Sequence, residues 1–243
     1  GTSITGLDCL LAVALTACAG GGEPPAPSGS PASAPLEALK EPANSMSVSP
    51  PLSPAPVSAE ALAAYRALLA GEPGALDRPP EGLELHQVTL PPAEELEYVL
   101  LDLDGDGGAE LVVQMVAQPH QFNAVFHYGD GELSCWQYDI MEMSWRDYPL
   151  GDGAMVRQYD TGTGPNRYSN LYTVFRYLPD GETEECASLA VHQDTQEDGT
   201  EVFTYLVDDA EVDQDTFAAE FEELVGSRLL SLEDWTPATE RPG

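Results

Sequence analysis

Apolar side chains recur at helical spacing in the segment that follows Ser58. An apolar stripe there runs through Leu62, Tyr65, Leu68 and Leu69. Ser58 stands where an N-cap is expected, and Gly71 stands just beyond the run, where helices commonly end. The pattern therefore predicts a helix over residues 59–70.

Farther along, seven segments rich in β-branched and aromatic residues alternate with turn signals, which is typical of strands. The segments are 98–103, 110–117, 123–128, 133–140, 171–178, 185–192 and 202–207. Short Asp-Gly turns at 129–131 and 179–181 make two of the neighbouring pairs hairpins. We therefore expect a mainly antiparallel sheet.

A second helical segment is predicted over 213–226, because acidic residues begin it and Gly226 ends it. Helices at both ends of a run of strands are typical of the α+β class. The sequence therefore predicts a single α+β domain over 58–243, with a mainly antiparallel sheet, an N-terminal helix and a C-terminal helix.

The first residues of the chain have the features of an export signal. The apolar run 10–15 is shorter than the roughly 20 residues that span a bilayer, and it fits the h-region of a signal peptide. The following sequence Leu15-Thr16-Ala17-Cys18 resembles the bacterial lipobox. That resemblance implies a signal peptide over 1–17 and a lipidated Cys18 at the mature N-terminus. The alternative is a short buried helix in which Cys18 is an ordinary core residue.

The signal is expected to be truncated, because residues 1–7 contain no Lys or Arg of a basic n-region. Behind Cys18, residues 19–57 hold 10 prolines and no aromatic residue. Such a composition cannot bury enough apolar surface to offset its conformational entropy. We therefore expect a disordered tether over 18–57.

The charge of the chain limits its partners. It has 42 acidic residues against 9 basic ones, and a formal net charge of −33. This balance disfavours binding to nucleic acid and polybasic docking on a membrane surface. A cation or a basic partner is favoured instead.

One acidic loop carries recognisable chemistry. In the stretch 102–110, Asp102, Asp104 and Asp106 stand at positions 1, 3 and 5, and a glycine stands at position 6. This is the spacing of a calcium loop, in which position 7 offers its carbonyl and position 9 ligates directly or through water. Those positions are Gly108 and Glu110. Oxygen ligands favour Ca²⁺ over Zn²⁺, so the predicted cofactor is Ca²⁺.

The loop departs from the EF-hand, because position 12 is Val113 and both flanks have the pattern of strands. It resembles the strand-flanked loops of integrin-type FG-GAP repeats, which are EF-hand-like in their ligand spacing. The resemblance covers about a dozen residues, and it implies the ion but not the fold. The alternative is an Asp-Gly turn that binds nothing.

Cysteine, aromatic and histidine residues give weaker signals. Cys135 and Cys186 could form a disulfide in an exported protein, and two buried thiols are the alternative. Trp136 and Trp145 could stack on a glycan, whereas large aromatic side chains usually fill a core. The four histidines are His86, His120, His127 and His192, and they show no metal-binding spacing.

The order of lipobox, tether, acidic loop between strands and closing strand–helix segment resembles lipoproteins of Gram-positive anaerobes. The resemblance implies a lipid-anchored protein on the extracytoplasmic face of the cell membrane, and it implies no activity. We therefore expect a binding or structural protein with one calcium ion. The sequence does not identify its ligand, for which a cell-wall glycan or a protein is a candidate. The alternative is a secreted carbohydrate-active or peptide-processing enzyme that uses some of the many acidic residues.

Overall fold

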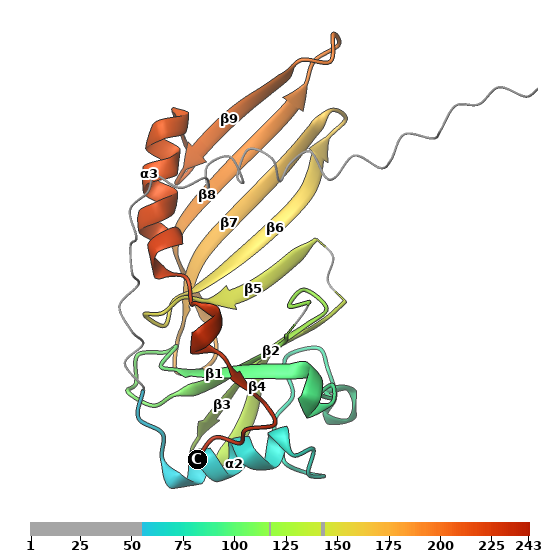
Figure 1. Ribbon diagram of the computed structural model, residues 1–243, viewed down its shortest axis with the longest axis vertical. Helices are drawn as coiled ribbons and strands as arrows, with labels where there is room; N and C mark the ends of the chain where they lie inside the picture. The colour runs from blue at the N-terminus through green and yellow to red at the C-terminus, as the bar shows by residue number, and fades with distance from the viewer. Residues whose placement is uncertain (1–54, 117, 142–143) are drawn as a thin grey trace, which may run out of the picture. The chain divides into compact units, whose positions relative to one another are not determined.

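Two antiparallel sheets form the framework of the protein (Figure 1). The computed structural model describes residues 55–243 except 117, 142 and 143. The strand order of the first sheet is β11-β1-β2-β3-β4. Its strands are Leu96–Leu101 (β1), Glu110–Met115 (β2), Phe122–Gly129 (β3), Glu132–Ile140 (β4) and Thr236–Pro237 (β11).

The second sheet has the order β10-β9-β8-β7-β6-β5. Its strands are Trp145–Pro149 (β5), Met155–Gly164 (β6), Arg167–Tyr177 (β7), Thr183–Thr195 (β8), Glu201–Val207 (β9) and Ala210–Val212 (β10). The structure therefore confirms the predicted α+β class with mainly antiparallel pairing. It divides the strands between two sheets and adds β5, β6, β10 and β11 to the predicted segments.

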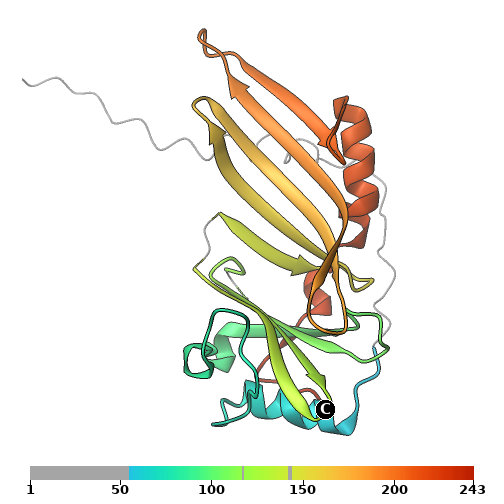
Figure 2. The same ribbon diagram turned by 180° about the vertical axis from the view of Figure 1, so that it is seen from behind.

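Each sheet is covered by one α-helix (Figures 1 and 2). Helix α2 (Ala59–Leu69) begins at the predicted cap, where the Ala61 N–H donates to Ser58 Oγ over 3.1 Å. It buries Tyr65 and Leu68 against the first sheet. Helix α3 (Gln214–Leu224) is capped by Asp213 and buries Phe217 against the second sheet.

Short 3₁₀ helices connect the remaining parts: Leu85–Gln87 (η1), Ala93–Glu95 (η2), Gly226–Arg228 (η3) and Leu232–Asp234 (η4). After α3 the chain returns to the first sheet, where β11 pairs with β1. The Ala238 N–H then donates to the Leu96 carbonyl over 2.9 Å, and Ala238 is fully buried. The described residues all belong to one compact unit of the chain.

A cluster of buried side chains joins the two sheets. Val99, Leu101 and Val112 of the first sheet share this cluster with Phe175 and Tyr177 of the second. Strands β1 and β2 therefore bury side chains on both faces, one toward α2 and the other toward the second sheet. The same cluster contains Leu103, which lies in the acidic loop and is 0% exposed.

The two cysteines in the described part of the chain are not joined to each other. Cys135 lies buried in β4, where its Sγ donates to the Gln137 carbonyl over 3.1 Å, whereas Cys186 lies exposed in β8. The predicted disulfide between Cys135 and Cys186 is therefore not formed, and both thiols are free. The alternative of two buried thiols holds for Cys135 only, because the Cys186 thiol is exposed.

The predictions for the signal peptide, Cys18 and the tether up to residue 54 lie outside the described residues. Among the described helices, none combines the length and the apolar character that a membrane crossing requires.

Candidate metal centre

The acidic loop connects β1 to β2, which form an antiparallel hairpin. The last pair of this hairpin places Leu101 opposite Glu110. Between them, the buried side chain of Leu103 fixes the loop to the cluster that joins the sheets. The loop is therefore held at both strand ends and at its second residue.

Backbone N–H groups of the loop organise its carboxylates. Asp102 accepts from the N–H groups of Gly105 and Gly107, over 2.8 and 3.0 Å. Asp104 Oδ1 accepts from the Asp106 N–H over 3.0 Å, and Asp106 Oδ1 accepts from the Gly108 N–H over 2.7 Å. The chain can turn this sharply because Gly107, at position 6 of the motif, has a φ of 91°.

The folded loop brings three carboxylates together. One oxygen each of Asp102, Asp104 and Asp106 lies within 4.8 Å of the others. We call these three residues the aspartate ring. The ring could hold a metal ion, as the sequence predicted for the same residues. Gly108 lies beside it, with its N–H directed to Asp106.

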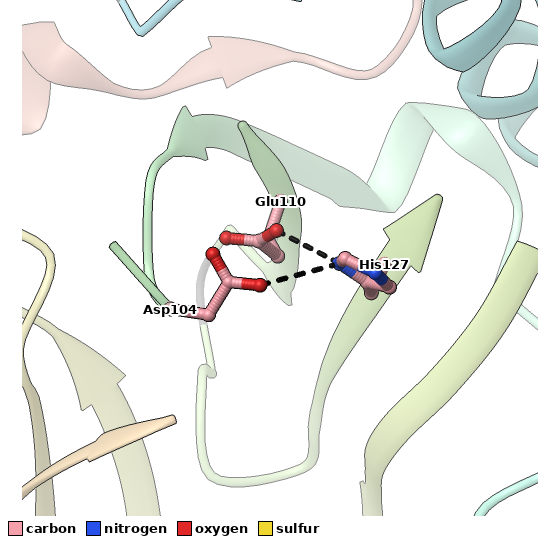
Figure 3. A group of neighbouring side chains, drawn as sticks. All are labelled: Asp104, Glu110 and His127. Atoms are coloured by element: carbon pink, nitrogen blue, oxygen red, sulfur yellow. Dashed lines mark hydrogen bonds and ion pairs between the residues drawn. The ribbon is translucent and has the colours of Figure 1, made fainter. Parts of the chain in front are cut away.

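Glu110 belongs to a second group, which it forms with Asp104 and His127 (Figure 3). We call this group the inner triad. Glu110 Oε1 lies 2.9 Å from His127 Nδ1, and Glu110 Oε2 accepts from the Leu103 N–H over 2.6 Å. Asp104 Oδ2 lies 3.9 Å from the same His127 nitrogen. The ligand atoms of the triad also lie within 4.8 Å of one another, so it too could hold a metal ion.

His127 reaches the triad because of the register between β2 and β3. Leu111 lies opposite Phe126 in that register, so the next position toward the loop sets Glu110 beside His127. The imidazole stacks on the Trp136 ring, with a centroid separation of 4.3 Å and an interplanar angle of 12°. On Gly129, a Cβ atom would lie 2.6 Å from His127 Nε2. The His127 imidazole is thus held in place by the Trp136 ring, and Gly129 leaves room for it because glycine has no side chain.

The side chains of the inner triad have little solvent exposure, although Asp104 and His127 are only partly buried as whole residues. The side chains of Asp104, Glu110 and His127 are 0%, 1% and 14% exposed. Burial raises the pKa of Asp104 to about 7, and burial also raises the pKa of Glu110 despite the hydrogen bond from His127. Burial alone would lower the pKa of His127, but the hydrogen bond and charge of Glu110 outweigh it and raise that pKa. Burial therefore disfavours the ionised forms of the two carboxyl groups, and a bound cation would favour them.

One atom of this site lacks a hydrogen bond. Asp104 Oδ2 is buried and has no hydrogen-bond partner among the described residues. It is directed toward Glu110 and His127 (Figure 3). A buried carboxylate oxygen without a partner costs free energy unless a cation or a donor satisfies it.

The last residues of the loop are tied to helix α2 and to the segment before it. The Ala109 N–H donates to the Pro56 carbonyl over 3.0 Å, and the Ala109 carbonyl accepts from the Tyr65 hydroxyl over 2.8 Å. The same hydroxyl accepts from the Tyr128 N–H over 3.2 Å. Tyr65 thus links α2, the loop and β3.

Comparison with family models, with curated proteins and with solved structures found no match to the chain.

The two tryptophans of the glycan prediction lie on different sheets. Trp136 of β4 is half-buried between His127 and Tyr177, whose ring centroid lies 5.0 Å away. Trp145 of β5 is also half-buried, with Tyr159 at 6.3 Å and the Arg157 guanidinium 5.3 Å from its ring centroid. The structure does not bring these two rings together, and glycan binding stays a prediction.

Proposed function

We propose that this chain is a lipid-anchored extracytoplasmic binding or structural protein, whose folded domain is stabilised by one calcium ion in the aspartate ring. The observation that carries the calcium proposal is the convergence of three carboxylates within 4.8 Å in a loop with calcium-loop spacing. Close carboxylates repel one another, and a divalent cation converts that repulsion into attraction.

The donor chemistry of the ring supports calcium. Its three side chains offer oxygen atoms, which hard cations such as Ca²⁺ prefer. Gly108, at the position that supplies a carbonyl in calcium loops, completes the proposed ligand set together with Glu110, directly or through water. Glu110 also braces the loop through the Leu103 N–H, so it supports the ring even where it does not touch the ion.

The expected affinity suits a structural ion. Calcium sites of extracellular modules have dissociation constants of about 10⁻⁴ to 10⁻³ M. At about millimolar calcium, such a site would stabilise the folded state by about 0.4 to 1.4 kcal/mol. A gain of this size helps to hold the loop and the two elements tied to it, α2 and β3.

Thermal unfolding tests the calcium proposal. We expect about 1 mM Ca²⁺ to raise the melting temperature of the protein by about 1 to 5 °C over an EDTA-treated sample. In Asp106→Asn this shift should disappear, because one ring carboxylate is lost. The matched control is Asp130→Asn in the β3–β4 turn, which makes the same charge change away from the ring and should keep the shift. If calcium neither changes the melting temperature of the wild-type protein nor gives binding heat in a calorimetric titration, the proposal is refuted.

The proposed anchoring rests on the lipobox-like sequence and on the proline-rich stretch behind it. We expect the protein, expressed in a Gram-positive host behind an initiating Met and a basic n-region, to enter the detergent phase of a Triton X-114 separation. Cys18→Ser should move it to the aqueous phase, because the thiol that accepts the lipid is missing. Detergent partition that is the same in both proteins would argue against lipidation of Cys18.

A further inference from the structure

The aspartate ring and the inner triad share Asp104 but differ in donor chemistry. The ring offers oxygen atoms, whereas the triad offers two carboxylate oxygens and the imidazole nitrogen of His127. Imidazole suits ions such as Zn²⁺, Fe²⁺ and Co²⁺, and it is seldom a ligand of Ca²⁺. The two groups are therefore suited to different ions.

The distances within the triad fit one small ion. Ligands at about 2.0–2.2 Å from an ion lie about 3.0–3.5 Å from one another in tetrahedral or octahedral geometry. His127 Nδ1 lies 2.9 Å from Glu110 Oε1 and 3.9 Å from Asp104 Oδ2. Small side-chain rotations would bring both distances to the required range.

Each of the three side chains is held in place independently of an ion. Glu110 is fixed by the Leu103 N–H, and Asp104 by the Asp106 N–H at its other oxygen. His127 is fixed by its stacking on Trp136. Side chains fixed in this way lose little conformational entropy when a metal binds. In known metal sites, contacts around the ligands orient them in the same manner.

The buried Asp104 Oδ2 atom points to a ligand in the triad. It belongs to a side chain that is 0% exposed, has no hydrogen-bond partner in the described part of the chain, and faces Glu110 and His127 (Figure 3). The other oxygen of the same carboxylate faces the loop, where it accepts from the Asp106 N–H. One carboxylate can therefore serve both groups, with one oxygen for each.

We propose that Asp104, Glu110 and His127 form a second metal site, which binds a divalent transition ion of the Zn²⁺ and Co²⁺ class. Asp104 bridges this ion to the calcium ion of the aspartate ring. The ion takes the place of the hydrogen now shared by His127 Nδ1 and Glu110, and water completes its coordination.

The charges of the loop support two ions. Asp102, Asp104, Asp106 and Glu110 carry four negative charges when ionised, and two divalent ions carry four positive ones. One calcium ion alone would leave two of these negative charges without a matching metal charge. The second site rests on the calcium proposal through Asp104 and through Glu110, which is also part of the proposed calcium ligand set, whereas His127 belongs to the second site alone.

Titration with Co²⁺, followed by its visible absorption, tests the second site in the full protein. With saturating calcium present, we expect one equivalent of Co²⁺ to bind and Zn²⁺ to displace it. His127→Gln should weaken Co²⁺ binding by about tenfold or more and leave the calcium affinity measured by calorimetry unchanged. Asp106→Asn should do the reverse, because Asp106 belongs to the ring and not to the triad.

The two proposals fail in different ways. If the wild-type protein binds no Co²⁺, or if calcium displaces Co²⁺ stoichiometrically, the second site is refuted while the ring can still bind calcium. If the protein binds Co²⁺ but no calcium, the ring proposal fails instead. If His127→Gln weakens calcium binding and leaves Co²⁺ binding unchanged, His127 positions Glu110 for calcium and is not a ligand.

A measurement on the wild-type protein covers the case in which His127→Gln does not fold. Paramagnetic Co²⁺ should shift the imidazole proton resonances of His127 far from their normal positions, and those of His192 much less. His192 lies on β8 of the second sheet and serves as the internal control. Equal small shifts for both histidines would overturn the assignment.

Discussion

Gly153 shows how closely the second sheet approaches the acidic loop. It lies in the turn between β5 and β6 with a φ of 89°, and a Cβ atom there would lie 2.1 Å from the Asp102 carbonyl oxygen. A side chain at position 153 would clash with the backbone at the start of the loop. The clash could be relieved only if the backbone of the turn or of the loop shifted. The position therefore requires glycine for two reasons, the backbone conformation and the contact.

We expect Gly153→Ala to lower the free energy of unfolding and to weaken calcium binding, because the turn and the loop must separate. The matched control is Gly131→Ala, since Gly131 has a similar φ of 78° and open space around its Cβ position. The control should cost about 1–2 kcal/mol for its left-handed backbone, and Gly153→Ala about 1–3 kcal/mol more. Urea denaturation measures both, and equal costs would contradict the role of the contact.

At the same scale, the ring residues could be predicted from the sequence and His127 could not. The spacing of Asp102, Asp104 and Asp106 within five residues determines that their side chains meet around one loop. His127 lies 17 residues after Glu110, and its approach depends on the register of β2 against β3. The sequence signal that could have pointed to His127 was a predicted strand that begins at Glu110 and another that ends near His127. The sequence alone did not determine that these two strands pair or in which register.

At the scale of elements, the turn between β5 and β6 is joined to neighbouring segments by ion pairs. Asp152 in this turn accepts from Arg228 of η3 over 2.7 Å, and Arg176 of β7 lies 3.5 Å away. Burial alone would raise the pKa of Asp152, but the hydrogen bonds from Arg228 and the Ala154 N–H outweigh it and lower the pKa below its usual value. The turn is therefore held in part by a carboxylate that must be ionised.

The sign of the pH dependence follows from the lowered pKa. The carboxylate contributes stability above its unfolded pKa of about 3.9 and loses that contribution as the pH falls through the folded value. We expect Asp152→Asn to destabilise the protein at pH 7 by no more than about 1 kcal/mol, because Asp152 is half-exposed. Urea denaturation at a series of pH values should show the difference from wild type shrinking below about pH 4. A difference that is constant with pH would show that the charge of Asp152 does not contribute.

The elements that escaped prediction have weak hydrophobic patterns. Strand β6 ends in Asp160-Thr161-Gly162-Thr163-Gly164, and the glycines and the residue between them are exposed. Strand β11 is two residues long and contains Pro237. Their strand conformation comes from pairing with β7 and β1, which is a property of the assembled sheets.

At the scale of the whole molecule, the α+β class could be predicted, but the division into two sheets could not. Strand β2 is buried almost along its whole length, and such a strand must be covered on both faces. The sequence does not say what covers each face. In the structure α2 covers one face, and Phe175 and Tyr177 of the second sheet cover the other.

The hydrogen bond between Pro56 and Ala109 has a mechanical consequence. If the domain is held through the residues that precede Pro56, as the proposed anchoring requires, tension enters the fold at this point and acts directly on the acidic loop, beside the cap of α2. A bound ion would then stiffen the attachment point itself, where a pull on the chain begins to act.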